Sequence, residues 1–324
     1  MYSIQELSDI IDKSLNQLEL PQQPERLYQP IKYILSTGGK RIRPVLTLAA
    51  CNAFSTTIDN AIYPALAVEV FHNFTLIHDD IMDNADMRRN KQTVHVKWDS
   101  NVAILSGDAM SIYAYQLLQK VNPSHLPNVL SVFNSFAMGI CEGQQMDMDF
   151  ESKSFVAQEE YIRMIELKTS ILLEGALKIG AIIGGASNAD VTNIGDFGRN
   201  IGIAFQLQDD LLDTYGDASV FGKKIGGDIV ANKKTILTVM AMSHAKGQDL
   251  ELLNSYFKLP NMDPVKKVEG VTDIYNRLNV KQHVEELIEK YHQKAIAHLA
   301  KVNIAPEKKA ILEELTERLM ARKN

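Results

Sequence analysis

Apolar residues recur with the period of an α-helix along almost the whole chain. They fall at positions i, i+3, i+4 and i+7, whereas the alternation that is typical of strands is scarce. Glycines and prolines interrupt the pattern at intervals. This periodicity predicts an all-α fold of long helices over residues 2–18, 24–36, 42–54, 60–83, 101–121, 126–150, 157–186, 190–213, 232–245, 248–257, 263–278, 280–301 and 306–322.

The chain of 324 residues has the length of one large domain or of two ordinary ones. No Gly/Ser-rich linker separates the helical windows. We therefore expect one all-α domain over residues 1–324, with the chemistry in about 30–240 and peripheral helices over 241–324. Several glycines lie inside predicted helices, where each costs about 1 kcal/mol relative to Ala, and they indicate close helix packing.

Composition narrows the function classes. The net charge of −6 gives no support for nucleic-acid binding. Two cysteines, Cys51 and Cys141, make no disulfide framework and suit a reducing cytosol. The N-terminus lacks the basic start and apolar block of a signal peptide, and the longest apolar stretch, 171–186, is broken by Glu174 and Lys178. We expect a cytoplasmic protein without a membrane span.

Two copies of the pattern Asp-Asp-x-x-Asp carry the strongest chemical signal. Each copy ends an apolar helical window. Aspartates four residues apart share a helix face, where they repel by about 0.2–0.5 kcal/mol unless a cation lies between them. Mg²⁺ prefers carboxylate oxygens together with substrate phosphates. The predicted metal ligands are Asp79, Asp80, Asp83, Asp209, Asp210 and Asp213.

Cations accompany the first motif. Lys40 and Arg43 follow a glycine pair at the start of a predicted helix and share one face of it. Backbone N–H groups and cations at a helix start bind anions, although a basic surface turn would have the same sequence. Arg88 and Arg89 come after the motif, and arginine forks suit phosphate recognition.

Lysines accompany the second motif. Lys168-Thr169 lies within an apolar helical stretch, where the lysine either extends to the surface or faces a polar cavity. Lys223 and Lys233 flank Asp228 just after the second motif. Together, the acidic motifs and the cations indicate a site for diphosphates bridged by Mg²⁺.

The order of six segments resembles the trans-isoprenyl diphosphate synthases, also called polyprenyl synthetases. The segments are GGKRIRP, LIHDDIMDNADMRR, GQQMDMDFE, Lys-Thr, FQLQDDLLD and GKKIGGD followed by NKKT. The resemblance covers roughly residues 30–240 and is specific, because all six must coincide in order. It implies the isoprenoid synthase fold, a homodimeric all-α bundle around a central cavity.

The resemblance also implies an activity. Such enzymes condense an allylic diphosphate with isopentenyl diphosphate, head to tail, and release diphosphate. Mg²⁺, as three ions with substrate bound, assists ionisation of the C–O bond. The isopentenyl double bond then attacks the allylic cation in a dry, apolar pocket, and a proton is lost. No side-chain nucleophile is needed.

A role for each matching residue follows from the same resemblance. Direct Mg²⁺ ligands would be Asp79, Asp83 and Asp209, with Asp80, Asp210 and Asp213 completing the motifs behind them. The allylic diphosphate would be held by Arg88, Lys168, Lys223 and Lys233. Isopentenyl diphosphate would be held by Gly39, Lys40, Arg43, His72 and Arg89. The reacting carbons would be lined by Thr169 and Gln206, which with Lys168 and Lys223 form the catalytic set.

Product length in this family depends on residues just before the first motif. Phe74 lies five residues before Asp79, roughly 7.5 Å along the helix. Thr75 is small, and Phe71 is about one turn further from the motif. An aromatic residue at position 74 would form the floor that closes the product pocket. In this respect the chain resembles synthases of C15 or C20 products. Alternatively, Phe74 is ordinary core packing and the floor lies elsewhere.

Other readings remain open at the level of sequence. A synthase of longer chains would share all six segments. A terpene cyclase would share the first motif but not the second, and a non-catalytic subunit of a heteromeric synthase would be expected to lose one motif. Incidental Ca²⁺ binding would not explain the ordered cations. His78 and His95 are expected to make structural hydrogen bonds, because phosphate-bridging Mg²⁺ prefers oxygen.

Some positions depart from the family pattern. NKQT follows Arg89 where a glycine and a proline are usual, and Asn232 replaces a glycine before Lys233. The first motif has two residues between its aspartates, unlike some bacterial farnesyl synthases. A basic tail, Arg322-Lys323, is a candidate to close over the site.

Overall fold

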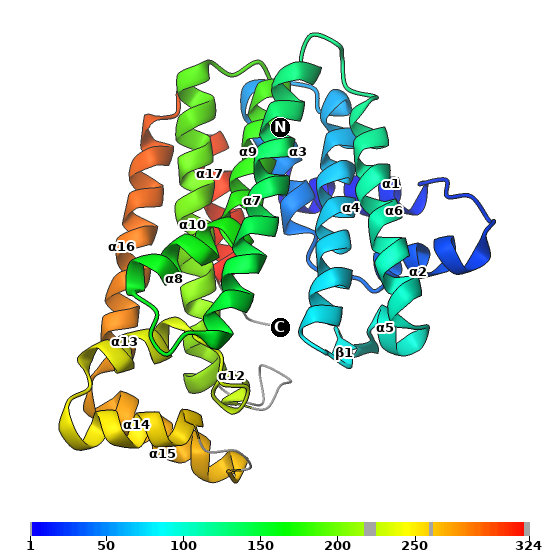
Figure 1. Ribbon diagram of the computed structural model, residues 1–324. Coiled ribbons are helices and arrows are strands. Elements are labelled where there is room, and N and C mark those ends of the chain that lie inside the picture. Colours follow the sequence, from blue (N-terminus) through cyan, green and yellow to red (C-terminus); the bar gives the residue numbers. More distant parts are fainter. Residues whose placement is uncertain (1, 217–224, 259–261, 321–324) are drawn as a thin grey trace. The chain divides into compact units, whose positions relative to one another are not determined.

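The computed structural model describes residues 2–216, 225–258 and 262–320 (Figure 1). Within these ranges the chain is almost entirely helical, and one short antiparallel hairpin is its only sheet. The all-α prediction is therefore confirmed. Lys223 and the tail Arg322-Lys323 lie outside the described residues.

The longer helices follow the predicted windows closely, whereas two short helices, over residues 94–97 and 227–230, lie outside every predicted window. They are α1 (Ile4–Asn16), α2 (Glu25–Ser36), α3 (Ile42–Phe54), α4 (Asp59–Met82), α5 (Val94–Lys97), α6 (Ser100–Leu118), α7 (Leu126–Ser152), α8 (Gln158–Ile165), α9 (Ile171–Ile183), α10 (Asn188–Tyr215), α12 (Gly227–Val230), α13 (Ile236–His244), α14 (Gly247–Lys258), α15 (Pro264–Arg277), α16 (Val280–Lys301) and α17 (Pro306–Met320). A π-helix, η1 (Glu166–Ser170), joins α8 to α9. The hairpin consists of β1 (Met87–Arg88) and β2 (Lys91–Gln92), with Arg88 paired to Lys91.

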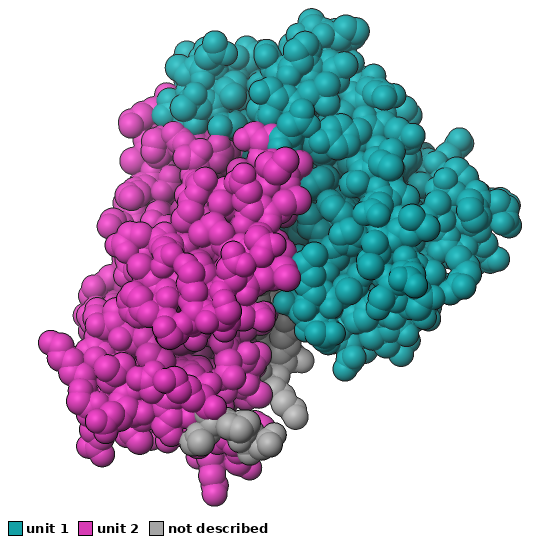
Figure 2. Space-filling model, in the orientation of Figure 1, with its two compact units in different colours: residues 1–134, 175–194, 302–315 teal, residues 135–174, 195–301, 316–324 magenta. Residues whose placement is uncertain are grey.

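The chain divides into two compact units, coloured in Figure 2. Unit 1 comprises residues 1–134, 175–194 and 302–315, and unit 2 comprises 135–174, 195–301 and 316–324. The first acidic motif belongs to unit 1 and the second to unit 2. A single domain with peripheral C-terminal helices stays a prediction.

Unit 1 is built on α4, which packs against α3 and runs beside α6 (Figure 1). Glycines let helices approach closely here. A Cβ on Gly180 of α9 would lie 2.1 Å from the carbonyl oxygen of Thr47, and one on Gly184 would lie 2.7 Å from that of Cys51. The bare backbone at these positions is what allows α9 to lie against α3, as the helical glycines in the sequence indicate.

Unit 2 has its own core of buried side chains from α8, α10, α13, α15 and α16. Leu207 of α10, Val271 of α15 and Val284 of α16 are fully buried in it. Tyr275 is also buried, and its hydroxyl lies 2.9 Å from that of Thr238. The helices after residue 240 thus supply much of this core.

No helix in the described ranges combines the length and the apolar character that a membrane crossing requires.

Candidate functional site

The first acidic motif lies at the C-terminal end of α4. Asp83 caps the helix, and its N–H donates to the carbonyl of Asp79 at 2.8 Å. Asp79 is half-buried and Asp83 is exposed, whereas only 1% of Asp80 is accessible. The helix therefore presents Asp79 and Asp83 outward and turns Asp80 into the protein.

Asp80 is held by Arg88 from the hairpin. Nε and Nη2 of Arg88 each lie 2.7 Å from Oδ1 of Asp80. Oδ2 of Asp80 is buried and finds no hydrogen-bond partner among the described residues. Burial raises the pKa of Asp80, and the charge of Arg88 acts in the opposite direction. Arg88 was predicted to bind the allylic diphosphate, and in this structure its guanidinium holds the motif.

The hairpin that carries Arg88 was not predicted. Arg89 and Asn90 form its turn with φ values of 52° and 59°, as two-residue hairpin turns of type I′ require. The guanidinium of Arg89 donates to the carbonyl of Gly38 and lies against Gly39. A Cβ on Gly39, whose φ is 130°, would meet Cζ of Arg89 at 2.7 Å, so this position requires glycine.

The loop that contains Gly38 and Gly39 also contains a buried arginine, Arg41, for which the sequence predicted no role. Arg41 adopts a φ of 48° and is buried. Its Nη1 lies 2.5 Å from Oε1 of Glu69, a carboxylate that also accepts from Asn73 at 2.9 Å. Arg41 also donates to the carbonyl of Leu35. This buried pair fixes the loop that presents the neighbouring cations.

Several arginines lie near His72. Burial lowers the pKa of His72 well below its usual range, and the positive charges of Arg43, Arg89, Arg88 and Arg41 lower it further. The imidazole is therefore neutral at physiological pH, with arginines grouped about it. The structure thus gathers Gly39, Arg43, His72 and Arg89, as predicted for isopentenyl diphosphate, while Lys40 is exposed. Such a cluster suits a diphosphate.

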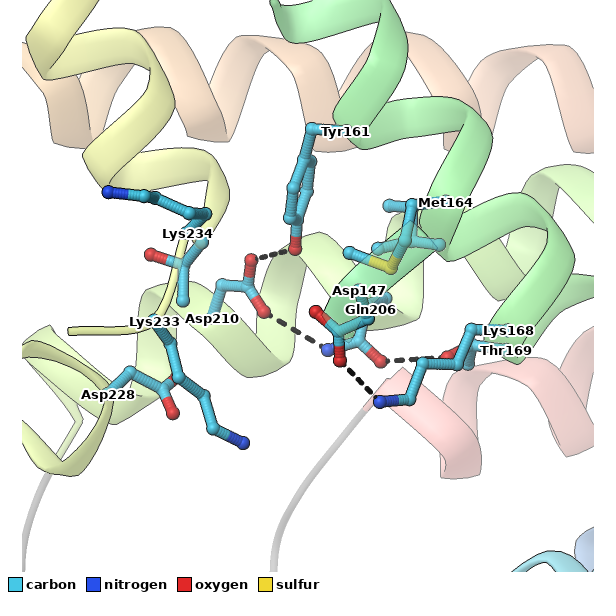
Figure 3. Close-up of a pocket in the computed structure, with 12 residues that line it drawn as sticks. Asp147, Tyr161, Met164, Lys168, Thr169, Gln206, Asp210, Asp228, Lys233 and Lys234 are labelled. Carbon is cyan, nitrogen blue, oxygen red and sulfur yellow. Dashed lines mark hydrogen bonds and ion pairs between the residues drawn. The ribbon is translucent and has the colours of Figure 1, made fainter. Parts of the chain in front are cut away.

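The second motif borders a cavity of about 120 Å³ in unit 2 (Figure 3). Three of the predicted catalytic residues line it, namely Lys168, Thr169 and Gln206. Lys233 lines it as well, together with Asp210 and Asp228.

Both carboxylate oxygens of Asp210 accept hydrogen bonds. Its Oδ2 accepts from the hydroxyl of Tyr161 and from the backbone N–H of Ile236 at 3.1 Å, and its Oδ1 accepts from Nε2 of Gln206 at 3.0 Å (Figure 3). Burial raises the pKa of Asp210 to about 6, although these donors lower it. Its oxygens are thus used to orient the motif. Tyr161 was missed, because a tyrosine in an ordinary amphipathic helix carries no signal of its partner.

Lys168 and Thr169 lie on the π-helix, a form that is frequent at functional sites. Two glycines flank it. A Cβ on Gly143 of α7 would lie 2.4 Å from the backbone nitrogen of Lys168, and one on Gly202 of α10 would lie 2.6 Å from Cα of Ser170. The wide turn therefore fits between two bare stretches of helix backbone.

These contacts aim both side chains into the cavity. Nζ of Lys168 lies 2.5 Å from Oδ2 of Asp147, and the hydroxyl of Thr169 donates to Oε1 of Gln206 at 3.1 Å (Figure 3). Asp147 belongs to the segment GQQMDMDFE but had no predicted role. It supplies a counter-charge for Lys168 at the cavity.

The segment after the second motif is tied down by a buried lysine. Nζ of Lys267 on α15 donates to Oδ1 of Asn232 at 2.5 Å and to the carbonyl of Val230 at 3.3 Å. Asn232 has a φ of 58°, a conformation that asparagine tolerates better than most residues. Oδ2 of Asp213 accepts from the N–H of Asp228 at 2.9 Å. Asp213 therefore orders this segment.

The predicted chain-length residues form part of an aromatic row. Phe71 is buried, and its ring centroid lies 5.1 Å from that of Phe74 and 5.2 Å from that of Phe133 on α7. Thr75 donates to the carbonyl of His72 at 2.8 Å. His78 makes the expected structural hydrogen bond, to the carbonyl of Ile104 at 3.2 Å.

The carboxylates of the two acidic motifs are suitable ligands for Mg²⁺. In the part of the chain that the structure describes, no three His, Cys, Asp or Glu side chains come together to form a metal site by themselves. Each motif instead offers half-buried or exposed carboxylates beside cations, and Mg²⁺ is usually held by one or two carboxylates plus substrate phosphates. The metal ligands remain a prediction.

The chain belongs to the polyprenyl synthetase family, whose model matches residues 24–276. It is 36% identical to the geranylgeranyl diphosphate synthase of Methanosarcina mazei over 96% of this chain and 94% of that protein. A crystal structure of a geranylgeranyl pyrophosphate synthase matches at 42% identity with a TM-score of 0.95, covering 100% of both chains. That of Pyrococcus horikoshii matches at 34% identity and a TM-score of 0.92, covering 99% and 97%.

Proposed function

We propose that the chain is a Mg²⁺-dependent head-to-tail prenyltransferase that condenses isopentenyl diphosphate with allylic diphosphates. The product is an all-trans prenyl diphosphate of C15 to C20, and the names of the similar proteins favour C20. The observation that carries the proposal is the arginine cluster around a neutral His72, beside an acidic motif. A terpene cyclase has no need of such a second diphosphate site.

The cations bind and orient the two diphosphates. Arg43, His72 and Arg89 hold isopentenyl diphosphate, with the neutral imidazole donating a hydrogen bond. Lys168 and Lys233 hold the allylic diphosphate, and Lys168 exchanges its contact with Asp147 for the substrate. Asp79 and Asp83 of the first motif and Asp209 of the second would hold Mg²⁺, which would supply positive charge to the leaving diphosphate.

The oxygens of Thr169 and Gln206 stabilise the cation that forms on the allylic carbons. The hydroxyl hydrogen of Thr169 is directed to Gln206, which leaves its lone pairs free to face positive charge. Electrostatic stabilisation of this kind is worth about 10²–10³ in rate for one removed group. The proton lost after carbon–carbon bond formation goes to the departing diphosphate.

We place the floor of the product pocket at Phe74. The residue is half-buried on α4, and its neighbours in the aromatic row hold it on two sides. Replacement of Phe74 by Ala removes the ring and is expected to lengthen the product.

A homodimer is part of the proposal. α6 carries large apolar side chains on its surface, with 60% of Leu105 and 61% of Ile112 exposed. Ile104 and Tyr115 are also exposed, and at 3.6 residues per turn all four project within an arc of roughly 100°. A second copy would cover this stripe. Leu105→Glu is expected to yield a monomer by light scattering, whereas Val265→Glu, on an equally exposed residue of α15, is not.

We place the enzyme in the cytoplasm, because its thiols suit a reducing compartment. Cys51 is buried and Cys141 is exposed, and the two are not joined.

A product assay tests the function. The purified protein is incubated with Mg²⁺, isopentenyl diphosphate and, separately, the C5, C10 and C15 allylic diphosphates, and dephosphorylated products are sized by mass spectrometry. A C15 or C20 alcohol supports both the chemistry and the floor. Products of C30 or longer would keep the chemistry and remove the floor. No condensation by folded protein would favour a cyclase or a non-catalytic subunit.

A further inference from the structure

Phe74 is clamped between two rings on the same face of α4. Its centroid lies 4.8 Å from the imidazole of His78 with an interplanar angle of 73°, and 5.1 Å from the ring of Phe71 at 68°. Both contacts have the edge-to-face geometry that aromatic pairs prefer. Since His78 is four residues after Phe74 and Phe71 three before it, one ring lies on each side along the helix.

The position of His78 is set by α6. Its Nε2 donates to the carbonyl of Ile104 at 3.2 Å, and the ring lies 3.8 Å from the carboxylate of Asp108. Gly107 faces the imidazole directly. A Cβ at this position would lie 2.4 Å from Nε2 and 2.6 Å from Cδ2, both far below the 3.5–4.0 Å of an ordinary contact.

We propose that Gly107 and His78 are positioning residues that set product length by holding Phe74 in place as the floor. The inference rests on the proposed function and on the assignment of the floor to Phe74. A side chain at position 107 displaces the imidazole, because the ring is the movable end of His78 whereas the helix backbone is not. Phe74 then keeps only Phe71 as a ring partner and yields to the growing chain.

The same molecule offers a matched control. Gly184 on α9 also belongs to unit 1 and also lacks room for a Cβ, which would lie 2.7 Å from the carbonyl oxygen of Cys51 and 3.0 Å from Cβ of Phe54. Its neighbours belong to α3 and include none of the rings around Phe74. Gly184→Ala therefore crowds a helix contact in the same unit without affecting the ring contacts of Phe74.

The experiment measures product lengths of the full chain carrying Gly107→Ala, His78→Ala, Phe74→Ala, Gly184→Ala and the pair Gly107→Ala/Phe74→Ala. Each variant is assayed with isopentenyl diphosphate and the C15 allylic diphosphate, and the products are sized by mass spectrometry. We expect Gly107→Ala and His78→Ala to raise the share of product one isoprene unit longer at least threefold. The double variant is expected to match Phe74→Ala alone, and Gly184→Ala to match the unsubstituted chain.

The other outcomes separate the two proposals. If Phe74→Ala lengthens the product but Gly107→Ala and His78→Ala do not, the positioning role of Gly107 and His78 is wrong, and the assignment of the floor to Phe74 stands. If Gly107→Ala lengthens the product and Phe74→Ala does not, the effect does not pass through Phe74, and both are wrong. His78→Ala adds no bulk, so it keeps the test decisive should Gly107→Ala fail to fold.

Discussion

The two acidic motifs have the same sequence pattern but hold their middle aspartates in different ways. In unit 1, Asp80 is neutralised by one cation, Arg88, on a single oxygen. In unit 2, Asp210 has no paired cation in its hydrogen-bond set and accepts from a phenol, an amide side chain and a backbone N–H. The first motif thus depends on a charge and the second on neutral donors.

The first prediction concerns stability and has the largest expected effect. Arg88→Ala leaves Asp80 buried without its counter-charge, and breaking such a pair costs about 3–4 kcal/mol of unfolding free energy. Urea unfolding measures the loss. Arg26→Ala is the matched control, since its pair with Asp99 is 70% and 45% exposed and contributes less than about 1 kcal/mol. If the two variants lost equal unfolding free energy, the Arg88–Asp80 pair would contribute no more to stability than an exposed pair.

The second prediction uses pH. The pKa of Asp210 is about 6 in the folded protein, above its ordinary value of 3.8, so the folded state binds more protons than the unfolded state between these values. Stability attributable to this group is therefore fully present below pH 3.8 and falls as the pH rises toward 6, by about 3 kcal/mol. Asp210→Asn should flatten this fall in urea unfolding without Mg²⁺ from pH 4 to 7. An unchanged pH dependence would show that Asp210 is not protonated more readily on folding.

The third prediction separates orientation from stability at the second motif. Tyr161→Phe removes one of the donors of Asp210 and is expected to cost about 1–3 kcal/mol of unfolding free energy. Because Asp210 orients the motif that contains the predicted ligand Asp209, kcat is expected to fall about 10–100-fold, as it does when a group that supports a metal ligand is lost. Tyr275→Phe removes a buried hydroxyl that bonds Thr238 instead. It should lose comparable stability and keep kcat. A similar kcat for both variants would place Tyr161 outside the catalytic machinery.

The fourth prediction is the smallest and tests the segment after the second motif. Asn232→Gly keeps the left-handed backbone but removes one of the two hydrogen-bond acceptors of Lys267, whose other acceptor is the carbonyl of Val230. We expect a loss of about 1 kcal/mol and a KM for the allylic diphosphate raised severalfold with little change in kcat, since Lys233 is presented less firmly. Unchanged kinetics would show that the backbone conformation alone orders this segment.

Sequence reasoning located the helices because their apolar faces repeat over many turns. The predicted window 42–54 and α3 (Ile42–Phe54) coincide, since the signal is summed over the entire helix. The π-helix within the window 157–186 was not predicted, because one wide turn leaves the apolar pattern almost unchanged. The hairpin was missed too, although Asn90 in its turn offered a weak signal.

The site was partly predictable for a related reason. Residues whose chemistry is unusual for their surroundings, such as Asp79 or Lys168, stand out in an apolar helix. Tyr161 and Arg41 do not, because a tyrosine or arginine is common in any amphipathic helix or loop. Their importance comes from a partner distant in sequence, Asp210 and Glu69 respectively. Only the folded chain shows such pairs.

The wide turn at residues 166–170 is equivalent to one extra residue inserted into an otherwise continuous helix. Each residue advances an α-helix by about 100°. The residues of the wide turn each advance the helix by less than this, so the turn absorbs the extra residue, and α9 continues the direction and register of α8. Deleting one residue from this turn would close it into a regular helix and leave the side chains of α9 in place, so the loss would fall on the backbone that carries Lys168 and Thr169.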